Sequence, residues 1–513
     1  MDVVFEGRTL DEAGLMRHAR ALALKLRPGD TVALRGDLGA GKSTFARAFI
    51  RAALGDGGAE VPSPTFSIEQ TYETARGVIA HYDLYRLSGP DELAEIGWEQ
   101  RIGADLVLVE WPERAAGLLP DARIELDLAG ADDEAVRNVS LKAHASVADR
   151  VRRAVTIADF VGGVAAWRDA EIVYLQGDAS QRAYARLRDG MGKTAVLMDS
   201  PRQPDGPPVR DGKPYSRIAH LAEDVSSFVR ISGRLAETGL VVPEVIAADE
   251  MLGLLLLTDL GDLQFGTALD CGIDQRMLWT AALDCLVHLR RANPSRDVGR
   301  ASEGAMPLPR FDRAALEIEV GLMLDWYWRH HVKAPLTDDI AASFWAAWAP
   351  VFDRMQQRAP GWFLRDYHSP NLLWQPERQG IGRVGIIDFQ DALGEHWAYD
   401  VASLLQDARR DVPRGLEQDL LQRYMAEIGA VVPDFDGQEF LSAYADFGAQ
   451  RNTRLIGLWV RLLKRDGKPN YLQHMPRTWD YLERNLAHPG LASVKAWFDQ
   501  HISQVVRKKP VER

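Results

Sequence analysis

The feature that most restricts the fold of this chain is the segment GDLGAGKST at residues 36–44. Its spacing fits G-x-x-x-x-G-K-[S/T], and it lies between an apolar stretch, TVALRG, and a helical one, STFARAFIRAAL. In this setting backbone N–H groups and a helix N-terminus face an anion together. The segment therefore predicts a phosphate-binding loop in an α/β domain with a mainly parallel sheet.

The residue types of this loop indicate which ligands it binds. Its glycines let the backbone turn toward phosphates, its lysine can reach the terminal phosphates of ATP, and its hydroxyl can bind Mg²⁺. We therefore expect ATP and Mg²⁺ as cofactors. The expected nucleotide-binding residues are Gly36, Gly39, Gly41, Lys42, Ser43 and Thr44.

Further polar residues follow other apolar stretches of the same region. Asp83 follows VIAHY, Glu110 closes DLVLV, and Thr65 lies in SPTFSIEQTY. In a doubly wound sheet the ligands gather at the carboxyl ends of the strands. We expect Thr65, Asp83 and Ser43 to bind Mg²⁺ and Glu110 to act on the attacking water. The alternatives are a cap or surface role for either acid, and an ordinary strand at 63–72.

A second and unrelated pattern lies at residues 364–374, LRDYHSPNLLW. Asp366 precedes Asn371 by five positions, and Asp388 closes the apolar stretch VGII. This is the order of catalytic-loop and metal-binding residues in kinase-type phosphoryl transfer. We expect Asp366 to accept the proton of a substrate hydroxyl, and Asn371 and Asp388 to bind Mg²⁺.

The length of the chain leaves room for both sites, because 513 residues exceed one hydrophobic core of ordinary size. Strands and helices alternate over residues 1–128, whereas antiparallel strands and then long helical stretches follow residue 150. We expect a P-loop α/β domain at 1–145 and a bilobal, kinase-like α+β domain at 146–513. Residues 215–239 are expected to form one amphipathic helix.

The charge and hydropathy of the chain exclude some partners. A net charge of −12 argues against strong direct binding to nucleic acid, which needs clustered basic residues. The one basic run, at 506–513, is expected to be a solvated tail. The longest apolar run, at 251–257, is far shorter than a membrane span, and the N-terminus lacks a signal-peptide pattern. We expect a cytoplasmic protein without membrane contact.

The N-terminal 140 residues resemble a known family. The segments GDLGAGKST, VPSPTFSIEQTY, HYDLYRL, IGWEQ and LVLVEWPER occur in this order, as in the TsaE family of ATPases. These proteins assist the bacterial synthesis of threonylcarbamoyladenosine in tRNA. The resemblance implies that the partners are the TsaB and TsaD proteins. It also implies the nucleotide and metal residues Lys42, Ser43, Thr65, Asp83 and Glu110, with Trp111 beside them.

Residues 160–480 resemble the superfamily of aminoglycoside phosphotransferases and choline kinases. Within it, GDASQRAYARL, AVLMDSP, LLLLTDLGD, RDYHSPNLLW, GIIDFQDAL and YDVASLLQDARRDV are similar to the AmgK family. That family phosphorylates the anomeric hydroxyl of N-acetylmuramate and N-acetylglucosamine in cell-wall recycling. The resemblance implies an amino-sugar acceptor and a sugar 1-phosphate product.

One position departs from the wider superfamily. Met198 lies near the place where a lysine usually contacts the α- and β-phosphates. We expect Arg182, Lys193 and backbone amides from Gly177 to Ser180 to contact the phosphates instead.

Several polar residues after the second pattern are candidates for recognition of the sugar. Asp391, Asp407 and Arg409 follow the metal-binding aspartate, and a later helix carries Arg451 and Asn452. Carboxylates that bind hydroxyls and an arginine that binds the lactyl carboxylate would suit N-acetylmuramate. Surface salt bridges are the alternative. Asp400 is expected either to brace the catalytic loop or to cap a helix.

The sequence thus predicts a bifunctional protein with a tRNA-modification ATPase and a sugar kinase. One alternative is a phosphotransferase with another acceptor, an aminoglycoside or a choline-like alcohol. The other is a nucleotide-responsive scaffold whose second half is a pseudokinase. Nothing in the sequence indicates that the two sites communicate.

Overall fold

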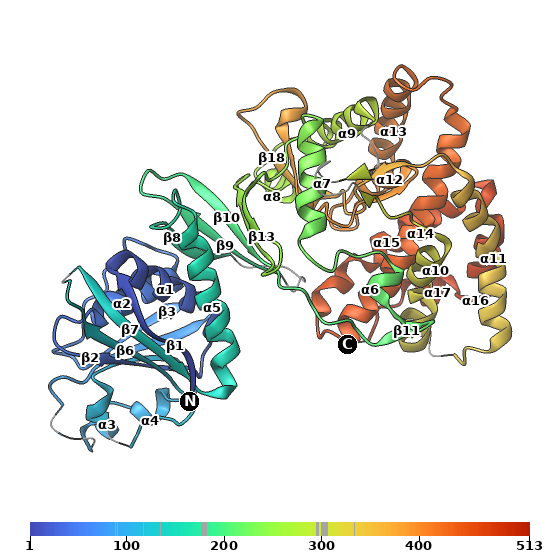
Figure 1. Cartoon of the computed structure of the whole chain (residues 1–513). Coiled ribbons are helices and arrows are strands. Elements are labelled where there is room, and N and C mark those ends of the chain that lie inside the picture. The colour runs from blue at the N-terminus through green and yellow to red at the C-terminus, as the bar shows by residue number, and fades with distance from the viewer. Residues whose placement is uncertain are drawn as a thin grey trace. The chain divides into compact units, whose positions relative to one another are not determined.

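The computed structural model describes residues 1–512 except 88, 90, 116, 134, 176–181, 294–296, 299–305 and 333. The chain forms two compact units (Figure 1). Unit 1 contains Met1–Pro201 and Ile246–Asp259, and unit 2 contains Arg202–Val245 and Leu260–Arg513. Unit 1 therefore includes strands that lie beyond residue 145 in the sequence.

A seven-stranded sheet with the order β1-β7-β6-β2-β5-β4-β3 forms the first part of unit 1. The four central strands, β6, β2, β5 and β4, are parallel, and antiparallel strands flank them on both sides. The predicted parallel core is confirmed. The bounds are β1 Asp2–Asp11, β2 Thr31–Gly36, β3 Glu69–Thr74, β4 Gly77–Asp83, β5 Leu106–Glu110, β6 Ile124–Gly130 and β7 Val136–Ala143.

Alternate residues of the central strands enter two different cores, as the pleat requires. In β5, Leu106 and Leu108 face one core, whereas Val107 and Val109 face the other. Three long helices cover the first face: α1 (Glu12–Lys25), α2 (Lys42–Leu54) and α5 (Ala145–Gly163). The second face is covered by short elements, α3 (Asp91–Glu95), α4 (Trp98–Arg101) and the 3₁₀ turn η1 (Pro112–Ala115).

A five-stranded sheet with the order β13-β14-β10-β9-β8 completes unit 1. The predicted antiparallel pairing of the segments that begin EIVYL and AYARL is confirmed. Apolar residues of this sheet, among them Ile172, Leu187 and Leu256, share one core with α1, α2 and α5. Those helices thus have apolar contacts with both sheets. The bounds are β8 Glu171–Leu175, β9 Ala183–Arg188, β10 Thr194–Asp199, β13 Val245–Asp249 and β14 Leu254–Thr258.

Buried charges reinforce this shared core. Asp199 of β10 is 4% exposed and accepts hydrogen bonds from Lys25 of α1 and Arg153 of α5. The Arg153 Nε atom lies 2.9 Å from Asp199 Oδ1. One carboxylate of the five-stranded sheet therefore binds two of the helices that cover the seven-stranded sheet.

Replacing Asp199 with alanine should lower the free energy of unfolding of unit 1 by about 2 kcal/mol, because two partly buried cations lose their acceptor. Urea denaturation would measure the change. Asp149→Ala is the matched control, since Asp149 is exposed on α5 and pairs with Arg152 at the surface; it should change the stability by less than about 0.5 kcal/mol. Equal stability of the two variants would contradict the prediction.

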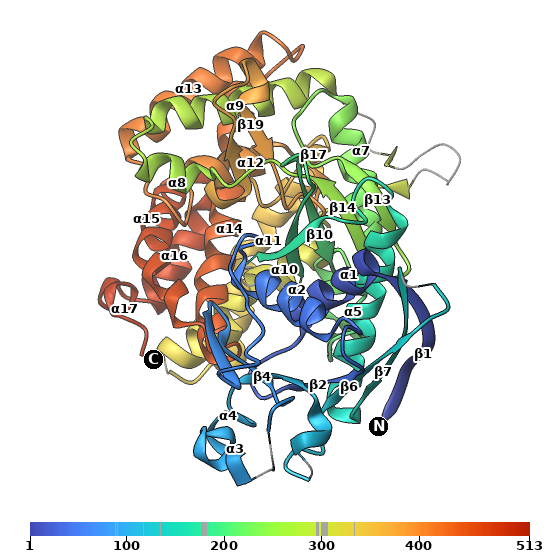
Figure 2. The ribbon, with the colours of Figure 1, turned by 90° about the vertical axis from the view of Figure 1, so that its left-hand side faces the viewer.

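Unit 2 is mainly helical. Its longest helix, α14 (Gly437–Lys464), packs against α12 (Ala398–Leu405), α15 (Met475–Leu486) and the π-helix η3 (Met323–Val332). Figure 2 shows α14 beside α15. The other helices are α6 Tyr215–Ile218, α7 Ser226–Glu237, α8 Phe265–Asp270, α9 Gln275–Ala292, α10 Arg313–Val320, α11 Asp338–Gln357, α13 Arg414–Gly429, α16 Ala492–His501 and α17 Gln504–Lys508. The 3₁₀ turns are η4 Ser369–Asn371, η5 Gly380–Arg383, η6 Pro469–His474 and η7 Pro489–Leu491.

Short strand pairs lie between these helices. Two of them, β17–β20 and β18–β19, flank the predicted catalytic loop. The bounds are β11 Pro208–Arg210, β12 Lys213–Pro214, β15 Asp297–Val298, β16 Met306–Pro307, β17 Gly361–Phe363, β18 Leu372–Trp374, β19 Val384–Ile386 and β20 Leu393–Glu395.

The single helix predicted at 215–239 is wrong, because residues 219–225 interrupt it. His220 has a positive φ of 52°, which an α-helix does not allow. The Ala219 carbonyl accepts a hydrogen bond from Arg365, and the Ala222 N–H donates to Asp391. Backbone groups of the break therefore contact the segments around the predicted catalytic residues.

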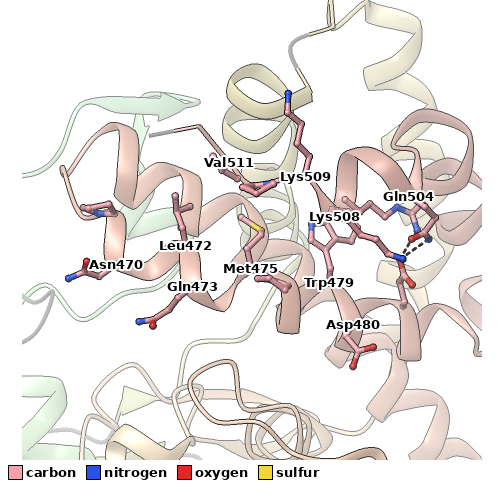
Figure 3. A pocket seen from close by; sticks show the side chains of 15 residues that line it. Asn470, Leu472, Gln473, Met475, Trp479, Asp480, Gln504, Lys508, Lys509 and Val511 are labelled. Carbon is pink, nitrogen blue, oxygen red and sulfur yellow. Dashed lines mark hydrogen bonds and ion pairs between the residues drawn. The ribbon is translucent and has the colours of Figure 1, made fainter.

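The basic C-terminal run is only partly the solvated tail that its composition predicts, because Lys508, Lys509, Pro510 and Glu512 are exposed but Arg507 and Val511 are buried. Arg507 is 5% exposed and pairs with Glu483 and Asp499. Lys508 and Lys509 line a cavity of about 750 Å³ between η6, α15 and α17 (Figure 3). None of the predicted site residues lines this cavity. Across the described part of the chain, no helix is both long enough and apolar enough to cross a bilayer.

Candidate active sites

The phosphate loop has the backbone conformation that its glycines predict. Gly36, Gly39 and Gly41 all have positive φ angles, of 139°, 78° and 106°. A Cβ atom at Gly36 would lie 2.3 Å from the Leu128 carbonyl oxygen, so no other residue fits there. Gly41 caps α2, which begins with Lys42. The loop therefore ends directly at a helix N-terminus.

Lys42 lies folded over this loop. Its Nζ atom donates to the carbonyl oxygens of Gly36, at 2.6 Å, and Asp37, at 2.9 Å. It also lies 3.7 Å from the centroid of the Trp111 ring, which confirms that this tryptophan is beside the loop. Burial lowers the pKa of Lys42, although Glu110 opposes the shift. A phosphate can compete for this amine, because charge-assisted hydrogen bonds are stronger than those to neutral carbonyls.

The predicted hydroxyl and carboxylate residues form two neighbouring pairs. Ser43 Oγ donates to Glu110 at 2.8 Å, and Thr65 Oγ1 donates to Asp83 at 2.8 Å. Asp83 and Glu110 are register partners at the ends of the parallel strands β4 and β5. They are 4% and 1% exposed. The sheet thus brings together the residues that the sequence predicts at its strand ends.

Two members of this cluster were not predicted. His81 Nε2 lies 2.9 Å from Glu110 Oε1, and Ser63 Oγ donates to Asp83 at 2.8 Å. His81 is two positions before Asp83 and hence on the same face of β4. The H-x-D spacing at a strand end was therefore the available signal for His81. Ser63 had no comparable signal.

The oxygen atoms of this cluster fit Mg²⁺. The Ser43 and Thr65 hydroxyls and the Asp83 carboxylate are hard ligands, and Mg²⁺ in nucleotide sites typically combines one or two such groups with phosphate oxygens and water. Within the described residues no group of three or more histidine, cysteine or acidic side chains forms a metal cage. The hydroxyl and carboxylate oxygens of the cluster suit a metal that enters with a nucleotide.

The second site is assembled by the hairpin of β18 and β19. Its pairing of Leu372 with Ile386 brings the residues just before and after the hairpin together. Asn371 Nδ2 donates to the Asp366 carbonyl oxygen at 2.9 Å and lies 3.3 Å from Asp388 Oδ2. The structure therefore unites Asp366, Asn371 and Asp388. Gln390, which was not predicted, donates to the other oxygen of Asp388 at 2.8 Å.

The Asp366 carboxylate is suited to accept a proton at neutral pH. Burial by itself raises the pKa of Asp366, but the charges of Arg454, His368, Arg365 and Arg451 outweigh burial and lower it. The carboxylate is therefore ionised well below pH 7. His368, whose pKa burial lowers, remains a neighbour of the base.

Two buried carboxylates position the catalytic loop. Asp400 accepts hydrogen bonds from the backbone N–H groups of Leu364, at 2.6 Å, and Arg365, at 3.0 Å, so the predicted bracing role is confirmed. Burial raises the pKa of Asp400 to about 7. Asp407 accepts from the N–H groups of Ser369, at 2.8 Å, and Arg409, at 2.7 Å. Since both Asp407 oxygens bind backbone, its placement favours a positioning role over the expected sugar contact.

The remaining expected ligands have varied environments. Asp391 accepts the Ala222 N–H at 2.6 Å, and the Arg409 guanidinium lies 4.9 Å from the Tyr471 ring centroid. Arg182 directly precedes β9, and Met198 is buried in β10. Gly177 and Ser180 lie outside the described residues.

Together these sites define the class of protein: a P-loop nucleotide-binding protein joined in one chain to a kinase-type phosphotransferase. The chain belongs to the phosphotransferase enzyme family, whose family model matches residues 171–437, and its N-terminal part belongs to the TsaE family of threonylcarbamoyl adenosine biosynthesis proteins, matched over residues 9–139. The chain thus joins an ATP-dependent phosphotransferase to a P-loop ATPase.

 

Three curated relatives show the same division of the chain. An N-acetylmuramate/N-acetylglucosamine kinase from Caulobacter vibrioides is 39% identical over 343 residues, which cover 65% of this chain and 93% of the relative. A kinase of the same name from Pseudomonas aeruginosa is 33% identical over 63% of this chain and 87% of its own length. The tRNA threonylcarbamoyladenosine biosynthesis protein TsaE from Rickettsia felis is 44% identical over 22% of this chain and 67% of its own length.

Proposed function

We propose that the kinase-like part of the chain, expected at residues 146–513, transfers the γ-phosphoryl group of ATP to the anomeric hydroxyl of N-acetylmuramate or N-acetylglucosamine. The single observation that carries this proposal is the assembly of Asp366, Asn371 and Asp388, in a chain that is 39% identical over 343 residues to a kinase of that name. The product is a sugar 1-phosphate. Both proposed activities use ATP, which favours a cytoplasmic location without membrane contact.

The residues of the kinase site divide the work of the transfer. Asp366 accepts the proton of the anomeric hydroxyl while the hydroxyl oxygen forms a bond to the γ-phosphorus of ATP. The bond between the γ-phosphorus and the oxygen that links it to the β-phosphate breaks, and ADP leaves. Asn371 and Asp388 would hold Mg²⁺, which supplies charge stabilisation on the phosphate oxygens. Gln390 orients Asp388 through its 2.8 Å hydrogen bond.

Other side chains are assigned to substrate binding in this proposal. Asp391 and Arg409 lie on the segments that follow the catalytic residues, and we assign them to the sugar. We assign Arg182, with backbone amides from Gly177 to Ser180, to the nucleotide phosphates in place of the usual lysine.

We also propose that the N-terminal part is an ATPase that supports threonylcarbamoyladenosine synthesis with the TsaB and TsaD proteins. The loop of residues 36–44 binds the phosphates, and Ser43, Thr65 and Asp83 would hold Mg²⁺. Glu110, braced by His81 at 2.9 Å, orients the attacking water. This part does not itself need to bind tRNA, in agreement with the net charge of −12 of the whole chain.

Phosphorus NMR of the full-length protein tests the kinase proposal directly. With Mg-ATP and N-acetylmuramate or N-acetylglucosamine, we expect a new sugar 1-phosphate signal. Choline and an aminoglycoside should give no phosphorylated product under the same conditions. A product from either of those alcohols, and none from the two amino sugars, would overturn the proposed acceptor.

Replacing Glu110 with glutamine should slow ATP hydrolysis by the N-terminal site about 100-fold, because the water loses its charged acceptor. The assay is made with TsaB and TsaD present and without sugar, in chains that also carry Asp366→Asn to silence the kinase. ATP binding should change little, as measured by titration with a fluorescent ATP analogue. Glu113→Gln, in the nearby turn η1, is the control; an equal effect of both changes would contradict the role of Glu110.

A further inference from the structure

One arginine close to the kinase site is buried without an ion-paired carboxylate. Arg451 of α14 is 2% exposed, and its Nε and Nη1 atoms have no hydrogen-bond partner among the described residues. A guanidinium remains charged in proteins, and a buried charge that is left unpaired is costly. The arrangement indicates an anion that does not belong to the described chain.

The neighbours of Arg451 on α14 have partners of their own. Gln450 donates to Glu319 at 2.9 Å, and Asn452 donates to Gln406 at 2.8 Å. Arg454 lies 3.4 Å from Glu319. Some oxygen atoms of this stretch, such as Thr453 Oγ1, also lack a partner, but Gln450, Asn452 and Arg454 each keep at least one polar contact, whereas neither Nε nor Nη1 of Arg451 has one.

The electrostatic surroundings place Arg451 near the base of the kinase reaction. Burial raises the pKa of Asp366, and Arg451 is one of the cations that reverse this effect. Arg451 also acts on His368, in the loop between Asp366 and Asn371. The charge of Arg451 therefore acts on Asp366, the residue that must face the acceptor hydroxyl.

The nearby carboxylates are already used by other groups. Glu319 binds Arg365 and Gln450, and Asp400 and Asp407 accept backbone N–H groups. Asp366 must stay free to accept a proton. The anion that reaches Arg451 is thus expected from a substrate. The acceptor is favoured over the nucleotide, because Arg451 acts on Asp366, whereas the phosphates are expected beside Asn371 and Asp388.

We propose that Arg451 binds the carboxylate of an acidic sugar acceptor and is the residue that favours N-acetylmuramate over N-acetylglucosamine. The inference rests on the proposed function, because it assumes an amino-sugar acceptor at this site. N-acetylmuramate carries a lactyl carboxylate, which matches the planar fork of a guanidinium. N-acetylglucosamine lacks this group, so it does not use the contact.

The test compares kcat/KM for the two sugars in the wild-type chain and in Arg451→Met. We expect kcat/KM for N-acetylmuramate to fall about 100-fold relative to kcat/KM for N-acetylglucosamine, as for removal of one partner of a buried ion pair. Any effect of the lost charge on Asp366 acts on both sugars and cancels in this ratio. Retained activity on N-acetylglucosamine also shows that the variant is folded. Arg461→Met, on the same helix and packed on Tyr215, is the control and should leave the ratio of the two values unchanged.

A second measurement uses the methyl ester of N-acetylmuramate, which keeps the lactyl group without its charge. The wild-type chain should prefer the acid to the ester, and Arg451→Met should lose that preference. Equal losses for both sugars, or an unchanged preference for the acid, would overturn the role of Arg451. If the wild-type chain phosphorylates neither sugar, the proposed function itself fails, and this result is distinct from a failure of the inference.

Discussion

Replacing Asp366 with asparagine should lower the kcat of sugar phosphorylation about 1,000-fold, within the range for loss of a general base. The amide keeps the shape of the carboxylate but cannot accept the proton of the acceptor hydroxyl. The KM values for ATP and sugar should change little, since Asn371 and Asp388 remain in place. A coupled assay of ADP release, with product confirmed by phosphorus NMR, measures both quantities.

The matched control for this change is Asp353→Asn. Asp353 is a solvent-exposed acid of α11 that pairs with Arg313. Its replacement should leave kcat within about twofold, because surface ion pairs contribute little. If Asp366→Asn keeps more than a tenth of the wild-type kcat, Asp366 is not the proton acceptor, and the phosphotransfer would depend on positioning of the substrates alone.

Local sequence was sufficient to predict the phosphate loop and the contact between Asn371 and Asp388. The phosphate loop depends on glycines within a few residues of one another, and Gly36 has a φ of 139° that matches this expectation. Asn371 and Asp388 are joined by a short hairpin. The pattern of apolar and polar residues along the hairpin therefore determines that these two side chains lie close together. The phosphate loop and this hairpin each depend on residues close together in the sequence, so both could be predicted without knowledge of the rest of the chain.

Features that depend on distant partners were not predicted. The edge strand β1 pairs with β7, whose residues follow more than a hundred positions later. The break before α7 exists because Arg365 and Asp391, far along the chain, bind backbone groups at 219 and 222. The amphipathic pattern of residues 215–239 contains no sign of these contacts, and periodicity alone therefore favoured a continuous helix.

The shared core of unit 1 joins segments that match the two different families. Helix α2 begins at Lys42 of the phosphate loop, and its buried residues Phe45 and Phe49 lie in the same core as Ile172 of β8. The sequence gives no sign of this contact, because each segment has the apolar pattern of an ordinary core. A compact fold therefore joins the helix after the phosphate loop to a sheet within the kinase-family match at residues 171–437.

The support of the catalytic loop depends on a second set of distant contacts. Arg365 directly precedes Asp366, is 0% exposed and has a positive φ of 71°. Its guanidinium binds Glu319 of α10, which also lies 3.4 Å from Arg454 and accepts from Gln450 at 2.9 Å. Burial opposes ionisation of Glu319, but Arg454 and Arg365 outweigh burial and lower its pKa.

Replacing Glu319 with glutamine should therefore lower the free energy of unfolding by about 3–5 kcal/mol, because two buried guanidinium groups lose their counter-charge. Urea denaturation at pH 7 measures the loss. The carboxylate stabilises the fold above the ordinary glutamate pKa of about 4.3, so the difference from wild type should shrink as the pH falls below that value. Glu317→Gln is the control on the same helix; its partly exposed pairs with Arg210 and Arg313 should contribute less than about 1 kcal/mol. Similar effects of the two changes would show that the buried network does not support the loop.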